Sequence, residues 1–263
     1  MKSWEKFELE CMNYLNKQFG RYATFIHQGG TDSSVSDILV RTNSGKQFYI
    51  DVKYLPAQCG QFVLLPNLKT CSFEYSKENM NEINDYTRMI IQHMNQNFNE
   101  FYKADTAGKE VKMENGSYIF SKWIIQTYKE KGVKFFITNN FTMIPIEKIE
   151  MYFEVSAKYR IKRSGSSSVG KNRITSVLNH IDSNDFVINR NRIDGSKLFV
   201  ESESNLHNHR FIYQEYEYMF SKRDQEYEVR KLSNTYHANV IFSIKKMNQI
   251  QGISDKEFIQ MLK

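Results

Sequence analysis

The 263 residues, 40% hydrophobic and 25% charged, suffice for one large domain or two modest ones, and the low content of proline (3) and glycine (12) excludes collagen-like and low-complexity chains. No apolar run approaches the roughly 18 residues of a membrane-spanning helix, and an N-terminus with three glutamates among its first ten residues is not a secretory signal, so we expect a cytoplasmic protein. The formal net charge of +6 is, by composition alone, typical of an ordinary solvated surface.

The first part of the chain has the pattern of a helix, several strands, two further helices and a last strand. Apolar residues recur at helical spacing over 3–19, where Gly20 ends the helix. Strands are then expected at 22–27, 37–41, 47–54 and 61–65, the last of them ended by Pro66. The stretch 42–46 has the composition of a hairpin turn. Further helices are expected at 77–103, 119–131 and 145–152, with a strand at 133–138.

After residue 154 strands and turns predominate. Strands are expected at 186–189, 197–201, 210–220 and 238–244, and 164–169 is a Gly/Ser stretch expected to be flexible. We place a soft boundary here, so that residues 1–154 form the core and residues 155–263 form a β-rich C-terminal elaboration, which is either a second subdomain or an extension of the same sheet. The fold class is therefore α/β or α+β, with a mixed central sheet flanked by helices.

The excess positive charge lies in the second part of the chain. Residues 1–154 contain 18 basic and 18 acidic side chains, whereas residues 155–263 contain 18 basic and 12 acidic ones. Within the latter, the stretch 158–173 has six basic residues and no acidic residue. A local basic block of this kind indicates a polyanionic partner, usually nucleic acid.

Two aspartates and a lysine form the clearest chemical pattern. In the expected strand 47–53, alternation of side chains places Asp51 and Lys53 on the same face, about 7 Å apart along the strand. Asp37 begins the preceding strand, and if the two strands pair as a hairpin it falls near Asp51. Two neighbouring carboxylates make a hard oxygen site suited to Mg²⁺, and a nearby lysine can orient or deprotonate a metal-bound water. The alternative is a surface ion pair between Asp51 and Lys53.

This pattern resembles the PD-(D/E)XK nucleases, a superfamily that includes most type II restriction endonucleases. Its members have an Asp and, about ten to twenty residues later on the next strand, Asp/Glu-X-Lys, which corresponds here to Asp37 and to Asp51-Val52-Lys53. Many members also carry Phe-Glu on the first helix followed by Leu, as in Phe7-Glu8 and Leu15. The stretch Gly29–Asp32 is similar to that of Mrr-type restriction nucleases. The resemblance covers roughly residues 4–65, and Ser36 stands where the family often has Pro.

The resemblance implies a role for each residue of the motif. Asp37, Asp51 and the carbonyl of Val52 are expected to bind the divalent metal, Mg²⁺, and Lys53 to position the attacking water or stabilise charge at the phosphate. Glu8 is expected to support these ligands or to bind a second metal, with Glu5 and Glu10 as alternatives. Gln61, one strand later, is a candidate for contact with the site or with the DNA backbone.

The stretch 165–172 nearly matches a phosphate-binding nucleotide loop, but Asn172 replaces the hydroxyl residue that would bind Mg²⁺. We interpret this stretch as part of a basic DNA-contacting segment. Candidate DNA-binding residues in the second part are Arg160, Lys162, Arg163, Lys171, Asn172, Arg173, Asn189, Arg190 and Arg192.

The expected function is Mg²⁺-dependent, site-specific cleavage of double-stranded DNA by a type II restriction enzyme. A homodimer is expected if the target is a palindrome, and a cognate DNA methyltransferase is expected in the same system, without a stable complex. Two alternatives stay open: another nuclease of the superfamily, acting in repair or junction resolution, and a non-enzymatic DNA-binding protein on the same fold. The presence of all three residues Asp37, Asp51 and Lys53 argues against the second.

Overall fold

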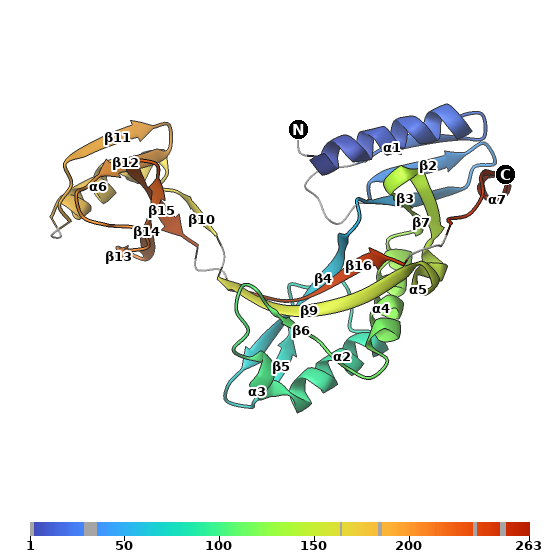
Figure 1. Ribbon diagram of the computed structural model, residues 1–263, viewed down its shortest axis with the longest axis horizontal. Helices are drawn as coiled ribbons and strands as arrows, with labels where there is room; N and C mark the ends of the chain where they lie inside the picture. Colours follow the sequence, from blue (N-terminus) through green and yellow to red (C-terminus); the bar gives the residue numbers. More distant parts are fainter. Residues whose placement is uncertain (1–2, 29–35, 164, 184–185, 234–235, 248–250) are drawn as a thin grey trace. The chain divides into compact units, whose positions relative to one another are not determined.

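Two units make up the chain in the computed structural model, which describes all residues except 1–2, 29–35, 164, 184–185, 234–235 and 248–250 (Figure 1). The first unit comprises Met1–Arg160 and Ala238–Lys263, and the second comprises Ile161–His237. The chain thus leaves the first unit after Arg160 and returns to it at Ala238. This division differs from the expected one, which placed the whole of residues 155–263 in the second part.

A mixed sheet in the first unit carries the hairpin singled out by the sequence. Its strand order is β1-β2-β3-β7-β8, with neighbours antiparallel except for β3 and β7, which are parallel. The strands are β1 (Ala23–His27), β2 (Ile38–Thr42), β3 (Gln47–Lys53), β7 (Val133–Thr138) and β8 (Thr142–Pro145). The expected mixed central sheet is therefore confirmed.

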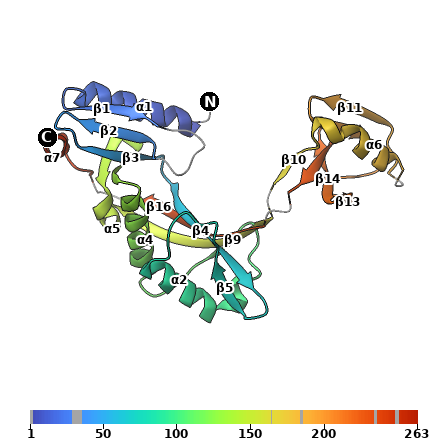
Figure 2. The same cartoon turned by 180° about the vertical axis from the view of Figure 1, so that it is seen from behind.

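Helices cover both faces of this sheet. Helix α1 (Ser3–Phe19) and helix α7 (Asp255–Leu262) bury Leu15 and Phe258 against one face, together with apolar residues of the strands. Figures 1 and 2 both show α1 lying along the sheet. On the other face, Tyr128 of helix α4 (Gly116–Glu130) packs edge-on against Phe136 of β7, with ring centroids 4.9 Å apart. The short helix α5 (Ile149–Tyr152) and the 3₁₀ turns Asn139–Phe141 and Ile146–Lys148 complete this part.

A second sheet in the first unit has the order β5-β4-β16-β9-β6. Its strands are β4 (Ala57–Asn67), β5 (Ser72–Tyr75), β6 (Lys109–Glu110), β9 (Phe153–Arg163) and β16 (Tyr236–Lys246). The ring of Phe242 in β16 stacks on that of Trp123 in α4, with ring centroids 4.2 Å apart. Burial of such apolar side chains explains why the C-terminal stretch belongs to the first unit, because the hydrophobic effect favours their removal from water.

Two expected elements of this region differ in the structure. The single helix expected at 77–103 is replaced by α2 (Asp85–Gln96) and α3 (Phe98–Phe101); the side chain of Asn84 accepts a hydrogen bond from the backbone N–H of Thr87 and so begins α2 later than predicted. Strand β4 continues through Pro66, which pairs with Phe73 of β5. Proline is tolerated there because β16 no longer pairs with β4 at that level.

The second unit is a sheet of order β11-β12-β15-β14-β13, with β10 paired to β15 and helix α6 packed on it. The elements are β10 (Ser166–Ser168), α6 (Ile174–Asp182), β11 (Arg190–Asp194), β12 (Lys197–Glu201), β13 (Arg210–Tyr213), β14 (Tyr216–Arg223) and β15 (Glu226–Leu232), with a 3₁₀ turn at Lys171–Arg173.

The sequence predicted this unit less well than the first. The strand expected at 210–220 is a hairpin of β13 and β14, which turns at Gln214 with a positive φ of 55°. The strand expected at 186–189 is displaced to β11, and α6 was not predicted at all. Part of the expected flexible stretch forms β10. No helix in the described part of the chain is long and apolar enough to cross a membrane.

Candidate active site

The β2–β3 hairpin brings Asp37 and Asp51 together. Ile38 lies opposite Ile50 in the register of the two strands, so Asp37, immediately before β2, reaches the level of Asp51. The backbone N–H of Val52 donates a 2.7 Å hydrogen bond to Oδ2 of Asp37, which holds that carboxylate against β3. The tight turn between β2 and β3 sets this pairing, and Gly45 in that turn adopts a φ of +86°, which glycine tolerates.

The two carboxylates repel each other in a buried site. Burial, followed by the nearby charge of Asp51, raises the pKa of Asp37 to about 7, although the Lys53 ammonium and the N–H of Val52 act in the opposite direction. Asp51 is only 7% exposed, and its buried Oδ2 atom has no hydrogen-bond partner of good geometry. The same oxygen is in ion-pair contact with the amino group of Lys53.

Lys53 ends β3 with its amino group turned into the protein. Its side chain is 11% exposed. Burial disfavours its charged form, but the negative charge of Asp51 raises its pKa well above the usual value. Lys53 is therefore an ammonium ion at neutral pH.

Of the three glutamates considered on α1, Glu8 is the buried one. Its Oε2 lies 3.0 Å from Nε2 of His27, at the end of β1, and its charge contributes to raising the pKa of Asp37. Glu10 is exposed and pairs with Lys6 at 3.6 Å. His27 was not among the sequence-predicted site residues, although it ends the expected strand 22–27; the β1–β2 register places it opposite Ile38, next to Asp37.

Asp37 and Asp51 fit a divalent cation whose remaining ligands come from outside the protein side chains. Among the described residues, no group of three or more His, Cys, Asp and Glu side chains could hold a metal ion. However, Mg²⁺ in phosphate-processing sites is usually bound by one or two carboxylates, with water and phosphate oxygens completing the shell. The burial of Asp51 and the raised pKa of Asp37 are the properties of an oxygen pair that a cation would stabilise.

A polar groove lies on the second sheet of the first unit. It has a volume of about 660 Å³ and is lined in part by Gln58, Lys158, Arg160 and Ser243. The Nε atom of Arg160 is buried and lacks a hydrogen-bond partner, and the side chain of Gln58 donates to that of exposed Gln61 at 3.2 Å. Two sequence-predicted DNA-binding residues, Arg160 and Gln61, therefore lie at or near one polar surface.

The candidates in the second unit differ in how freely they face solvent. Lys162, Lys171, Asn172 and Arg190 are exposed. Arg173 lies over the ring of Tyr216 at 4.1 Å, and Arg192 donates two hydrogen bonds to Glu226, at 3.0 and 2.7 Å. The side chain of Asn189 donates to Glu203 at 3.4 Å. The side chain of Arg163 and the stretch Gly29–Asp32 lie outside the described residues.

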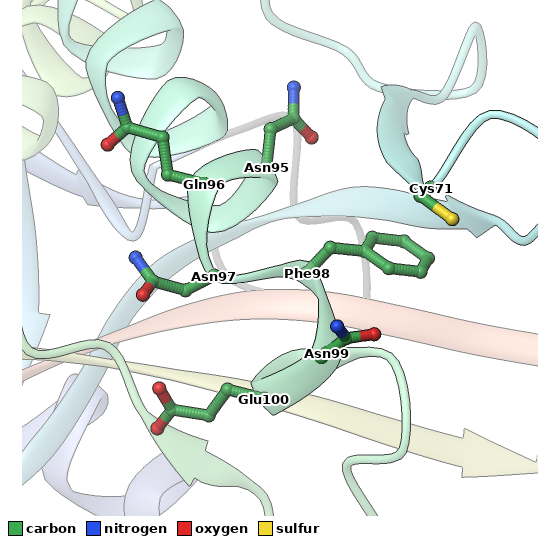
Figure 3. A pocket seen from close by; sticks show the side chains of 7 residues that line it. All are labelled: Cys71, Asn95, Gln96, Asn97, Phe98, Asn99 and Glu100. Carbon is green, nitrogen blue, oxygen red and sulfur yellow. The ribbon is translucent and has the colours of Figure 1, made fainter.

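A further pocket contains none of the sequence-predicted site residues. It has a volume of about 450 Å³ and is formed by the end of α2, the start of α3 and the turn after β4, with lining residues Cys71, Asn95, Gln96, Asn97, Phe98, Asn99 and Glu100 (Figure 3). Its lining holds one carboxylate among several amides, and nothing in its chemistry connects it with the aspartate pair.

Comparison with known proteins gives one informative match. No protein-family model matches the chain, and no curated protein matches it. The solved structure of HhaI endonuclease in complex with DNA is similar to it, with 38% sequence identity, a TM-score of 0.73 and coverage of 99% of each chain. This agreement confirms the expected restriction-endonuclease-like fold class. Since it extends over nearly the full length of both chains at this identity, the chain belongs to the family of HhaI endonuclease.

Proposed function

We propose that the protein is a Mg²⁺-dependent type II restriction endonuclease, which cuts double-stranded DNA at a specific sequence. The observation that carries the proposal is the register of β2 and β3, which brings Asp37 and Asp51 together beside the ammonium of Lys53. The family membership supports it, because the related HhaI endonuclease has been solved in complex with DNA.

Each residue of the site has a distinct part in the proposed reaction. Asp37 and Asp51, with the carbonyl of Val52, would hold the Mg²⁺ ion. When bound, this ion supplies a Lewis acid at the phosphate and lowers the pKa of a bound water. Glu8, held by His27, adds negative charge behind Asp37 and so favours a cation at the pair.

Lys53 acts in this proposal as a fixed positive charge. An ammonium ion with a raised pKa does not accept a proton from water at neutral pH, but it donates hydrogen bonds to an attacking water or to a phosphate oxygen. Such a preorganised donor stabilises the negative charge that develops on the phosphate in the transition state. The ammonium form of Lys53 is compatible with both roles that the family resemblance implies, and charge stabilisation at the phosphate is the role proposed here.

DNA binding is proposed for both units. In the first unit, Arg160 lines the polar groove, and the exposed side-chain amide of Gln61 offers a hydrogen-bond donor near it. In the second unit, Lys162 and Lys171 are exposed cations of the basic block. Phosphate contacts would set the affinity, and contacts with base edges would set the recognition sequence.

Incubation of plasmid DNA with the protein and Mg²⁺ tests the proposed function. Discrete fragments that disappear when EDTA is added are the expected result. Nicking that depends on DNA structure rather than sequence would favour a repair or junction-resolving nuclease. Retardation of the DNA without cleavage, in Mg²⁺ and in Mn²⁺, would indicate a DNA-binding protein without activity and would overturn the proposal.

The basic block is expected to act through phosphates. Replacing Lys162 and Lys171 by alanine removes two exposed charges, so binding should weaken on all DNA sequences and the slope of log K against log salt should flatten by about 2. The matched control replaces Lys69 and Lys77, two exposed lysines of the electrically neutral first part, and should leave the slope unchanged. An unaltered slope in a folded Lys162/Lys171 variant would show that the block is only a solvated surface.

A further inference from the structure

The amino group of Lys53 lies among side chains that the carboxylate site does not explain. It is 5.1 Å from the ring centroid of Tyr128 and 5.5 Å from that of Phe136. Cys59, from β4, is fully buried and close enough to Lys53 for the ammonium to affect the pKa of the thiol. Three elements other than β3 therefore contribute to the surroundings of this one amino group.

The side chain of Tyr128 brings a hydroxyl group to the surroundings of the Lys53 amino group. Tyr128 is 6% exposed, and its edge-on contact with Phe136 fixes the plane of its ring. The hydroxyl is close enough to the amino group of Lys53 and to the thiol of Cys59 for interactions with these groups to affect its pKa and that of the thiol. A buried tyrosine hydroxyl normally has such partners, because leaving it unpaired is costly.

The flexible side chain of Lys53 needs contacts that fix its conformation if its ammonium is to act at one position. This side chain has four rotatable bonds, and fixing them in one conformation has an entropic cost. Asp51 can pair with the ammonium from one side, but a metal ion bound to Asp51 would compete for the same oxygen. A second hydrogen-bond acceptor, one that does not bind the metal, would keep the ammonium in place both before and after the metal ion binds.

We propose that Tyr128 is a positioning residue for Lys53: its ring and hydroxyl hold the ammonium at the level of Asp51, ready for the substrate phosphate. This inference rests on the proposed function, in which Lys53 is the charge-stabilising group. Tyr128 itself does not touch the substrate. The competing explanation is that Tyr128 is a core aromatic residue, for which phenylalanine would serve equally well.

The first test uses Tyr128→Phe, which keeps the ring and removes only the hydroxyl. Single-turnover cleavage in saturating Mg²⁺ should slow roughly 3- to 10-fold, the effect of one lost hydrogen bond. DNA affinity measured in Ca²⁺ should stay the same. The matched control is Tyr159→Phe, which removes another buried hydroxyl, one that donates to the backbone carbonyl of Leu64 at 2.8 Å. The control should lower the melting temperature without slowing the cleavage step in the folded protein.

A double-mutant cycle shows whether Tyr128 acts through Lys53. In the Lys53→Ala background, Tyr128→Phe should cause no further loss of rate, because the ammonium that it positions is gone. Equal losses in both backgrounds would overturn the inference. Wild-type cleavage by Tyr128→Phe, beside impaired cleavage by Lys53→Ala, would also overturn it while leaving the proposed function intact. Wild-type cleavage by Lys53→Ala would instead refute the proposed role of Lys53.

A second readout requires neither metal nor DNA. Acetylation of the folded protein by a limiting amine reagent, followed by peptide mass spectrometry, reports the accessibility of each lysine. Lys53 should react much more slowly than exposed Lys69, and Tyr128→Phe should raise its rate several-fold whereas Tyr159→Phe should not. An unchanged rate for Lys53 in the Tyr128→Phe protein would show that the hydroxyl does not hold the ammonium.

Discussion

The Asp51→Ala variant is expected to lose DNA cleavage in Mg²⁺, by a factor on the order of 10³ or more, while it still binds DNA. The loss follows because Asp51 is one of two carboxylates proposed to hold the metal, whose contribution to the transition state amounts to several kcal/mol. The variant also leaves the ammonium of Lys53 buried without its counter-ion, so a lower stability is expected. Cleavage assays should therefore be run well below the melting temperature of the variant, and binding measured in Ca²⁺.

Asp85→Ala provides the matched control for this variant. Asp85 begins α2 on the surface, with a side chain that is 85% exposed, and it pairs with Arg88 in solvent. Its removal should leave the cleavage rate unchanged. Full activity of a folded Asp51→Ala protein would remove Asp51 from the metal site and with it the proposed mechanism.

The Asp37→Asn variant is expected to lose cleavage as well, but with the opposite effect on stability. An amide is a much poorer ligand for a hard cation than a carboxylate. In the metal-free protein, however, burial and the repulsion of Asp51 raise the pKa of Asp37 to about 7 from 3.8. The asparagine has no charge to be penalised, and it can still accept the hydrogen bond from the N–H of Val52.

Proton linkage determines how the stability difference between Asp37→Asn and the wild type depends on pH. Between about pH 4 and pH 7 the unfolded chain has lost the proton of Asp37 while the folded protein retains it, so the contribution of Asp37 to the free energy of unfolding falls as the pH rises. Above pH 7 the penalty is complete and amounts to at most about 4 kcal/mol. Asp37→Asn should therefore be more stable than the wild type at pH 8 and nearly equal to it at pH 4.

Urea unfolding in EDTA at these two pH values measures the difference, with Asp85→Asn as the control that should show no pH-dependent gain. Equal or lower stability of Asp37→Asn at pH 8 would contradict the electrostatic description of the site. Wild-type cleavage by this variant across a range of Mg²⁺ concentrations would separately remove Asp37 from the metal-binding pair.

Much of the site could be predicted because it is local in sequence. The alternation of apolar and polar residues in 47–53 determined which face Asp51 and Lys53 share, and the turn residues before Lys46 determined the hairpin. A shift of one residue would turn the apolar side chains of β3 to the opposite face, so the register that brings Asp37 to Asp51 is strongly specified. The family resemblance singled out Glu8 on α1, with Glu5 and Glu10 as alternatives, and the structure shows that Glu8 is buried.

The errors in the fold arose where local patterns were ambiguous. The run 211–220 alternates like one strand, but the positive φ of Gln214 divides it into the β13–β14 hairpin. The stretch that forms α6 follows basic and Gly/Ser residues that suggested a loop, yet Ile174, Val177 and Ile181 recur at helical spacing and are buried against the second unit's sheet. In both cases burial in the tertiary structure decided between conformations that the local sequence permits.

The sequence by itself determined the hairpin with its two aspartates and lysine, the helix that carries Glu8 and the excess of positive charge in the second part of the chain. Only the tertiary structure decided what surrounds Lys53 and where the chain returns to its first unit. The parallel pairing of β3 with β7, the packing of Tyr128 and the course of β4 past Lys53 bring Phe136, Tyr128 and Cys59 to one amino group. These contacts join residues far apart in the chain, and their energies come from burial and hydrogen bonding between elements, which no local pattern of residues encodes.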